Sequence, residues 1–151
     1  MIMFDNISVV VPALDNNQYY PDGDLMRFGD TTLLEWKISQ ILGIISNKNI
    51  YISTPSDKII DLVQSYGVNF VKRSQESDPS QWIKESVAPI ESEFVLWTHA
   101  TSPFISAGDY RLMLETFFNP LKRFRVNALC PHSDFSITSS PLPPAVINWR
   151  D

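Results

Sequence analysis

Short β-branched runs alternate with amphipathic helical segments along most of this chain. Residues 7–11 (Ile-Ser-Val-Val-Val) are largely apolar, which is typical of a parallel strand that is covered on both faces. Further strands are predicted at residues 49–53, 68–71 and 94–98. Helices are predicted between and after them, from Thr31 or Thr32 to Asn47, from Ser56 to Gly67, over 82–90 and over 108–119. This alternation predicts an α/β fold with an open, mostly parallel sheet and helices on both faces.

The chain divides into one domain and a tail. Its 151 residues are enough for a single domain with a sizeable core. We place the α/β domain at residues 1–130 and expect a further strand at residues 126–130. Residues 131–151 are predicted to be a proline- and serine-rich C-terminal tail, because four of the eleven prolines lie from Pro131 onward. We expect the tail to be irregular or to dock on a partner surface.

Charge and composition exclude several classes of protein. Seventeen Asp and Glu against twelve Lys and Arg give a formal net charge of −5, which argues against a nucleic-acid partner. No apolar run is long enough to span a membrane, and the acidic start does not resemble a signal peptide. The single cysteine, Cys130, favours a reducing cytoplasm, and with His132 it supplies too few ligands for a metal site.

Two loops are predicted at the ligand-binding edge of the sheet. Residues 13–30 follow the first strand and residues 98–106 follow the fourth, and ligands of such sheets bind outside the carboxyl ends of the strands. The candidate ligand-binding residues in these loops are Ala13, Asp15, His99, Thr101 and Ser102.

Each of these residues also has a purely structural interpretation. Residues 101–103 (Thr-Ser-Pro) form either a helix-entry turn or the wall of a ligand pocket. His99 is either a structural histidine or a ligand contact, and Asp15 is either a solvated carboxylate or a Mg²⁺ ligand. Trp36, Trp82 and Trp97 are expected in the core.

Four segments in order resemble the acylneuraminate cytidylyltransferases, which activate acidic sugars. They are residues 9–13 (Val-Val-Val-Pro-Ala), 32–36 (Thr-Leu-Leu-Glu-Trp), 50–54 (Ile-Tyr-Ile-Ser-Thr) and 95–104 (Val-Leu-Trp-Thr-His-Ala-Thr-Ser-Pro-Phe). The resemblance implies a Rossmann-like sheet with strand order 3-2-1-4 plus a further strand. It also implies transfer of CMP from CTP to an acidic sugar, with Mg²⁺ as cofactor if the chain is active. Arg73 falls where the family places an arginine that contacts the base. The resemblance thus implies nucleotide binding, with a base or sugar pocket, at the candidate residues Ala13, Asp15, Arg73, His99, Thr101 and Ser102.

The chain departs from the family pattern where phosphates should bind. The family has a basic, glycine-containing loop after the first strand, whereas residues 13–30 carry four aspartates and only Arg27, a net charge of −3. His99 stands where the family has a glutamine, Ile105 where it has an arginine, and Pro55 where it has an aspartate. The family's paired metal-binding aspartates have no counterpart in Asp134 and Asp151, which are single carboxylates. Because one contact ion pair is worth up to about 4 kcal/mol at an intermediate dielectric, this loop should hold CTP poorly.

Two functions therefore remain open. The first is a cytidylyltransferase homologue with weakened or lost catalysis. The second is a non-catalytic module of the same fold that binds a nucleotide or sugar or serves in assembly. Both are compatible with CTP or CMP and an acidic sugar as ligands and with a homo-oligomer. A flavodoxin-like or response-regulator-like domain is a third possibility, but its phosphate loop or phosphorylatable aspartate is not evident.

Overall fold

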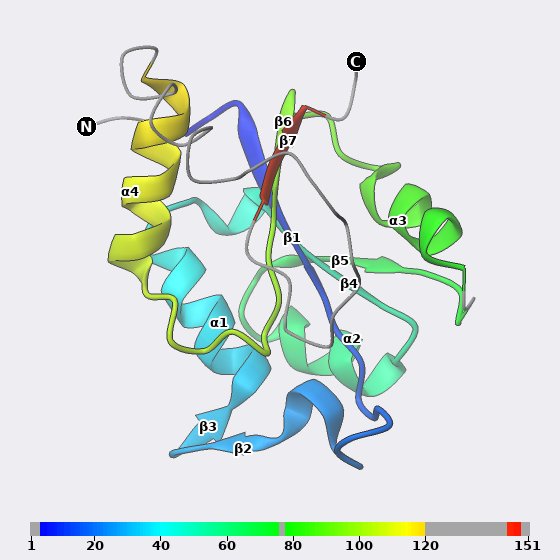
Figure 1. The fold of residues 1–151 in the computed structure, drawn as a ribbon. Coiled ribbons are helices and arrows are strands. Elements are labelled where there is room, and N and C mark those ends of the chain that lie inside the picture. The colour runs from blue at the N-terminus through cyan, green and yellow to red at the C-terminus, as the bar shows by residue number, and fades with distance from the viewer. Residues whose placement is uncertain (1–3, 76–77, 120–144, 149–151) are drawn as a thin grey trace, which may run out of the picture.

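A five-stranded sheet forms the centre of the computed structural model, which describes residues 4–75, 78–119 and 145–148 (Figure 1). The strand order is β5-β4-β1-β6-β7. The strands are β1 (Ile7–Pro12), β4 (Ile50–Thr54), β5 (Asn69–Lys72), β6 (Phe94–Trp97) and β7 (Ala145–Asn148). The first four strands in this order are parallel, with Val9 opposite both Ile50 and Leu96. The α/β fold and the order 3-2-1-4 of the four predicted strands are confirmed.

The fifth strand differs from the prediction. β7 pairs antiparallel with β6, although residues 145–148 lie in the segment predicted to be an irregular tail. The expectation of an irregular chain is therefore wrong for these four residues. β6 would otherwise leave its backbone groups unpaired at an edge, and β7 satisfies them. The strand predicted at residues 126–130 lies outside the described residues.

Helices cover both faces of the sheet, as expected. The helices are α1 (Leu33–Leu42), α2 (Asp57–Gln64), α3 (Pro79–Val87) and α4 (Ala107–Phe118), with 3₁₀ turns at Gly23–Leu25 and Asn47–Asn49. α1, α2 and α4 share one large core with Val9 and Val11 of β1. On the other face, Val10 packs in a smaller cluster with Ile90 and Val95 beside α3. Because side chains alternate along a strand, β1 contributes to both cores and is buried throughout.

The helix starts follow local signals in the sequence. Thr32 is the N-cap of α1, and its hydroxyl accepts from the Glu35 amide while the Glu35 carboxylate accepts from the Thr32 amide. Ser56 caps α2 in the same way through the Ile59 amide. Both predicted caps are confirmed. Each such cap is worth about 1 kcal/mol, because it satisfies amide groups that the first helical turn leaves without partners.

The end of α1 is a correction. The predicted helix extended to Asn47, but α1 ends at Leu42 and Gly43 is its C-cap. A Cβ at Gly43 would lie 3.2 Å from the Cβ of Ala107, the first residue of α4. Glycine is a poor helix former and a common helix terminus, and α4 packs closely against this one, whereas the apolar periodicity continues past it to Ile45.

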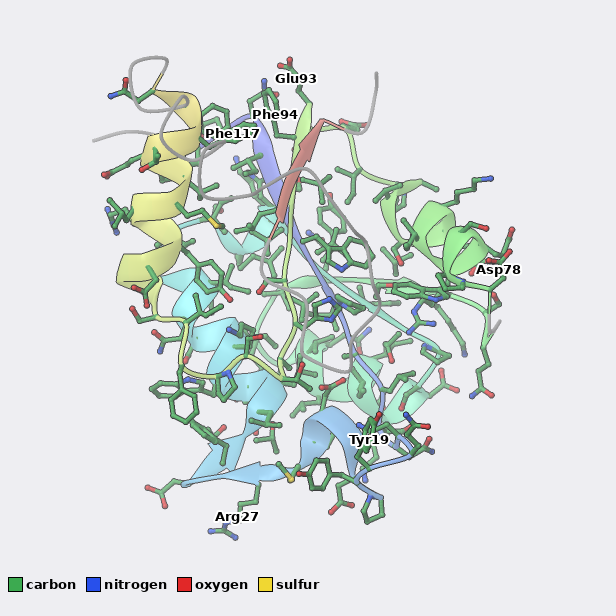
Figure 2. The ribbon with its side chains drawn as sticks, viewed as in Figure 1. Tyr19, Arg27, Asp78, Glu93, Phe94 and Phe117 are labelled. Carbon is green, nitrogen blue, oxygen red and sulfur yellow. The ribbon has the colours of Figure 1, made fainter. Side chains whose placement is uncertain are left out.

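The two ends of the sheet are different in character. Phe94 and Phe117 lie near its amino end, where their rings meet at 5.5 Å between centroids. Tyr19 and Arg27 lie at the opposite end, in the loop that follows β1 (Figure 2). That loop contains a small hairpin of β2 (Arg27–Phe28) and β3 (Thr31–Thr32). No helix in the described part of the chain is both long and apolar enough to cross a bilayer.

Candidate functional site

The loop after β1 is held in a fixed shape by contacts between its two arms. The Leu14 amide donates to Asp24 Oδ2 at 2.8 Å, and the Asp24 amide donates to the Leu14 carbonyl at 2.8 Å. Gly23 has φ +51°, and a Cβ there would lie 2.4 Å from the Leu14 carbonyl oxygen. Only glycine fits this close approach. Burial raises the pKa of Asp24 above its ordinary value, and the hydrogen bond from Leu14 opposes this effect.

A cavity of about 220 Å³, here called the polar cavity, opens at the carboxyl ends of β1 and β6. It brings together four of the six predicted site residues, which are Ala13, Arg73, His99 and Thr101. Leu14, Asn17, Asp24 and Trp82 also line it. The predicted cleft between the loop after β1, Arg73 and the loop after β6 is therefore present, and the roles of these residues in binding stay predictions.

Arg73 is the most unusual side chain in the polar cavity. It is only 9% exposed, and its guanidinium carbon lies 4.8 Å from the centroid of the Trp82 ring. Nη1 donates to the Ser74 carbonyl, but Nε is buried without a hydrogen-bond partner among the described residues. Burial lowers the pKa of Arg73, and the charge of Glu85 opposes this effect. A buried donor without a partner costs about 1–3 kcal/mol, so this arrangement suits a ligand that accepts a hydrogen bond there.

Trp82 lies in the site, although the sequence placed it in the core. It projects from α3, which is joined to the sheet by a hydrogen bond between Ser86 and Ser53. Its ring lies 5.6 Å from that of Trp97 and supports the Arg73 guanidinium. The sequence pattern of α3 could not separate these roles, because a tryptophan on the inner face of a helix can cover either a core or a cavity.

His99 is held as a neutral imidazole. Trp97 Nε1 donates to His99 Nε2 at 3.2 Å, so Nε2 carries no proton and Nδ1 does. Burial lowers the pKa of His99, and the charge of Lys37 lowers it further. His99 therefore offers the polar cavity a neutral ring with one N–H donor rather than a cation.

The loop after β6 is anchored to α1. Lys37 Nζ donates to the Ser102 carbonyl at 2.6 Å, and Trp36 Nε1 donates to the Pro103 carbonyl at 2.8 Å. Lys37 is fully buried, and it also donates to Tyr110 Oη, which shares a hydrogen bond with Thr98. Trp36 is at the surface and not in the core as expected. Sequence reasoning did not single out Lys37, although it lies on the apolar face of α1 and a cation at such a position is a signal.

Asp15 does not line either cavity of the site. Its Oδ2 accepts a hydrogen bond from Ser56 Oγ at 2.7 Å, next to the start of α2. Asp24 is turned to the Leu14 amide, and no group of three or more His, Cys, Asp or Glu converges within the described residues. Mg²⁺ is commonly held by one or two carboxylates together with substrate phosphates. The role of Asp15 as a Mg²⁺ ligand therefore stays a prediction.

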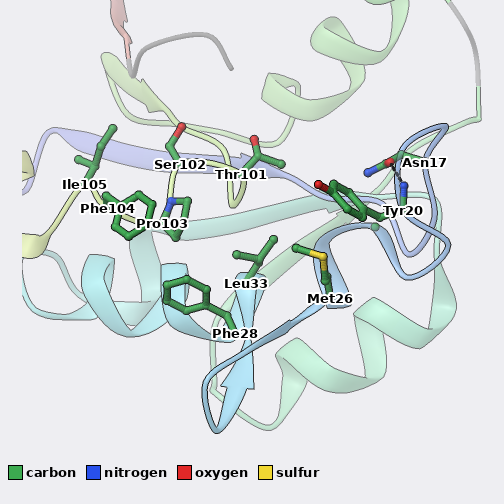
Figure 3. A pocket seen from close by; sticks show the side chains of 11 residues that line it. Asn17, Tyr20, Met26, Phe28, Leu33, Thr101, Ser102, Pro103, Phe104 and Ile105 are labelled. Carbon is green, nitrogen blue, oxygen red and sulfur yellow. Dashed lines mark hydrogen bonds between the residues drawn. The ribbon is translucent and has the colours of Figure 1, made fainter. Parts of the chain in front are cut away.

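A second and larger cavity adjoins the first. This apolar cavity has a volume of about 520 Å³ and lies between the β2–β3 hairpin and residues 101–105 (Figure 3). Ser102, the remaining predicted site residue, lines this cavity and not the polar one. Asn17 and Thr101 line both cavities, so the two spaces meet at these residues.

Solved structures of nucleotidyltransferases have this fold. A cytidylyltransferase from Leptospira borgpetersenii is 18% identical, with a TM-score of 0.65 over 76% of this chain and 50% of that chain. A CMP:2-keto-3-deoxy-manno-octonic acid synthetase complexed with CTP is 15% identical, with a TM-score of 0.63 over 84% and 50%. The 4-diphosphocytidyl-2C-methyl-D-erythritol synthase from Anaerococcus prevotii is 19% identical, with a TM-score of 0.57 over 74% and 50%. This chain therefore spans half the length of each of these structures, and at these identities the likeness shows the fold.

The sequence itself carries the family assignment. No curated protein matches the chain. The model of the cytidylyltransferase family matches residues 21–134, a range that begins within the loop after β1 and includes Arg73 and both anchors of the loop after β6. Because this match covers more than half of the sequence, the chain belongs to the cytidylyltransferase family.

Proposed function

We propose that this chain binds a cytidine nucleotide, CTP or CMP, with the pyrimidine ring in the polar cavity. The Arg73 guanidinium, which lines the polar cavity against Trp82 and is not fully hydrogen-bonded among the described residues, carries this proposal. Cytosine presents O2 and N3 as acceptors on one edge, and either can accept from a guanidinium N–H. The polar cavity is smaller than the roughly 300–1,000 Å³ of pockets that enclose whole ligands, so it suits one ring. A similar structure complexed with CTP supports the choice of nucleotide.

Catalysis with an acidic sugar is proposed to be weakened or lost in this chain. In that reaction a sugar hydroxyl oxygen attacks the α-phosphorus of CTP and the bond from phosphorus to the bridging oxygen breaks. Pyrophosphate leaves, and the hydroxyl proton passes to solvent. Phosphate charge must be stabilised throughout, but residues 13–30 carry a net charge of −3. Leu14 and Gln18 are exposed in this loop, but neither carries a positive charge that could stabilise the phosphates. This supports a chain that binds a nucleotide without efficient turnover.

A reducing compartment such as the cytoplasm is proposed for this chain, because a single cysteine, Cys130, is typical of proteins there.

Substitution of Arg73 tests the nucleotide site. Arg73→Met keeps much of the side-chain volume and removes the donor, so we expect the dissociation constant for CMP to rise at least tenfold. A hydrogen bond to a charged group is worth about 1.5–3 kcal/mol, and about 1.4 kcal/mol is a factor of ten. Isothermal titration calorimetry with CMP measures the change. Stability in urea should fall little, because the unpartnered buried donor is removed together with the charge.

Arg111→Met is the matched control, because Arg111 is exposed on α4, lines neither cavity and lies outside residues 13–30. It should leave the CMP affinity unchanged. AMP should bind at least tenfold more weakly than CMP, since adenine has no carbonyl oxygen to accept a hydrogen bond from Arg73. Equal CMP affinity in the Arg73 and Arg111 variants would refute the proposed site.

A further inference from the structure

The apolar cavity has walls of aromatic and aliphatic side chains and no charge. None of the described side chains that line it is ionisable at neutral pH. The apolar part of the wall includes Tyr20, Met26, Phe28, Leu33, Phe104 and Ile105. Its volume of about 520 Å³ lies within the range of small-molecule sites. Size and composition therefore suit a small uncharged ligand.

Flat aromatic surfaces stand open in this cavity. Phe104 is 89% exposed and Tyr20 is 52% exposed. The Phe28 ring meets the Phe104 ring edge to face, with 6.3 Å between centroids, and lies 5.7 Å from that of Trp36. Figure 3 shows Phe28, Phe104 and Tyr20 around one space, with Thr101 and Ser102 above it. Exposed aromatic rings gain most by covering an apolar face of a ligand.

Polar groups that can bind hydroxyls stand at the same cavity. Thr101 and Ser102 carry hydroxyls and Asn17 carries an amide, and all three line the cavity. Asn17 Oδ1 accepts from the Tyr19 and Tyr20 amides, so its NH₂ group keeps its donors for other partners. A ring with C–H groups on its faces and hydroxyls on its edges would match both kinds of wall.

An anionic ligand would meet no cation on the described wall of this cavity. The described cations on the adjoining elements lie outside that wall, where Arg27 Nε donates to the Gly29 carbonyl and Lys37 Nζ donates to the Ser102 carbonyl. Desolvating a carboxylate without a cation costs several kcal/mol. The cavity should therefore reject an acidic sugar and accept a neutral one.

We propose that the apolar cavity binds a neutral, hydroxylated ring, an uncharged sugar, next to the nucleotide. Asn17 and Thr101 line both cavities, so a sugar in the apolar cavity lies beside a ligand in the polar cavity. Its position as the neighbour of a nucleotide rests on the proposed function, whereas its neutrality rests on the uncharged wall. The bound species is the sugar itself, and no bond is made or broken on binding.

Two probes with the same ring separate the charge from the shape. Methyl β-D-glucopyranoside is neutral, and methyl β-D-glucuronide carries a carboxylate on the same ring. Amide spectra of the whole chain, recorded by NMR during titration, should show saturable shifts at Tyr20, Phe28 and Phe104 with the neutral glycoside. The glucuronide should bind at least tenfold more weakly. Phe104→Ser should weaken binding of the neutral glycoside at least fivefold.

Leu112→Ser is the matched control, because Leu112 is also a large apolar residue at the surface, 60% exposed on α4 and not in the cavity. It should leave the affinity for the neutral glycoside unchanged. Comparable or tighter binding of the glucuronide would overturn the inference, as would shifts that do not localise to the cavity. Equal losses in both serine variants would also overturn it.

CMP in the same titrations distinguishes this inference from the proposed function. CMP should shift the Arg73 Nε–H signal, and the neutral glycoside should shift the cavity amides in addition. If CMP shifts Arg73 but the glycoside shifts nothing, the inference is overturned and the proposed function stands. If the glycoside binds but CMP does not, the proposed function is overturned, and so is the placement of the sugar beside a nucleotide.

Discussion

Lys37 is a fully buried cation without an ion-pair partner among the described residues. Its Nζ is held by the Ser102 carbonyl and Tyr110 Oη, and it lies 4.9 Å from the centroid of the Tyr110 ring. Burial lowers the pKa of Lys37 from 10.5 to about 8. Between these two values the unfolded chain binds more protons than the native chain, so this residue makes stability rise with pH in that window. Below about pH 8 both states are charged, and the cost of burial is present in full.

Lys37→Met should therefore change stability in a pH-dependent way. The free energy of unfolding of the variant relative to wild type should decrease by about 1–2 kcal/mol between pH 7 and pH 9.5, because wild type gains stability over that range. Urea denaturation at both pH values measures it. Lys58→Met, at an exposed position on α2, is the control and should show no such change. A difference between Lys37→Met and wild type that is the same at both pH values would contradict the argument.

Helices α1 and α4 satisfy each other's terminal backbone groups. Gln40 Oε1 of α1 accepts from the amide of Ala107, the first residue of α4, at 3.0 Å. Arg111 of α4 donates to the carbonyl of Gly43 at the end of α1 at 3.1 Å. These groups would lack partners within their own helices. The pairing also fixes the end of the loop that carries His99 and Thr101.

Gln40→Ala removes one of these contacts. It should lower the free energy of unfolding by about 1 kcal/mol and speed hydrogen exchange of the Ala107 amide, because that amide loses its acceptor. Ser39→Ala is the control, since Ser39 is the exposed neighbour on the same helix and gains similar helix propensity. If both variants had equal stability and equal hydrogen exchange at Ala107, the contact between the helices would contribute nothing to stability.

At the scale of the whole molecule, the distribution of charge sets the expected activity. The net charge of −3 in residues 13–30 lies beside the polar cavity, which Leu14 and Asp24 line. A triphosphate placed there meets repulsion in addition to the loss of cationic contacts. We expect release of pyrophosphate from CTP and an acidic sugar to be undetectable for this chain.

Leu14→Arg combined with Gln18→Lys should raise CTP affinity at least tenfold, since each new charge-assisted contact is worth about 1.5–3 kcal/mol. The gain should shrink in high salt and should not restore turnover, because Asp15 and Asp24 are held by Ser56 and Leu14. Calorimetry and a pyrophosphate assay measure the two quantities. Leu14→Gln with Gln18→Met is the uncharged control. Rapid pyrophosphate release by the unmodified chain would contradict the argument from charge.

Local patterns in the sequence were sufficient for the framework of the fold. The β-branched run at residues 7–11 predicted a buried parallel strand, and the caps at Thr32 and Ser56 marked two helix starts. These signals reach only a few residues along the chain. The parallel sheet then brings strand ends together at one edge, which is why the polar cavity could be anticipated at Ala13, His99 and Thr101.

Contacts between distant residues decided the rest. Asp15 accepts a hydrogen bond from Ser56, 41 positions away at the start of α2, and lines neither cavity. Lys37 donates to Tyr110, which lies 73 positions away in the sequence. β6 pairs with β7, although residues 120–144 separate β7 from α4 in the sequence. Burial of Arg73 against Trp82 depends on where α3 packs. The periodicity of apolar residues predicts which face of a helix or strand a side chain occupies. The partners of that side chain are determined only when the helices and strands pack together.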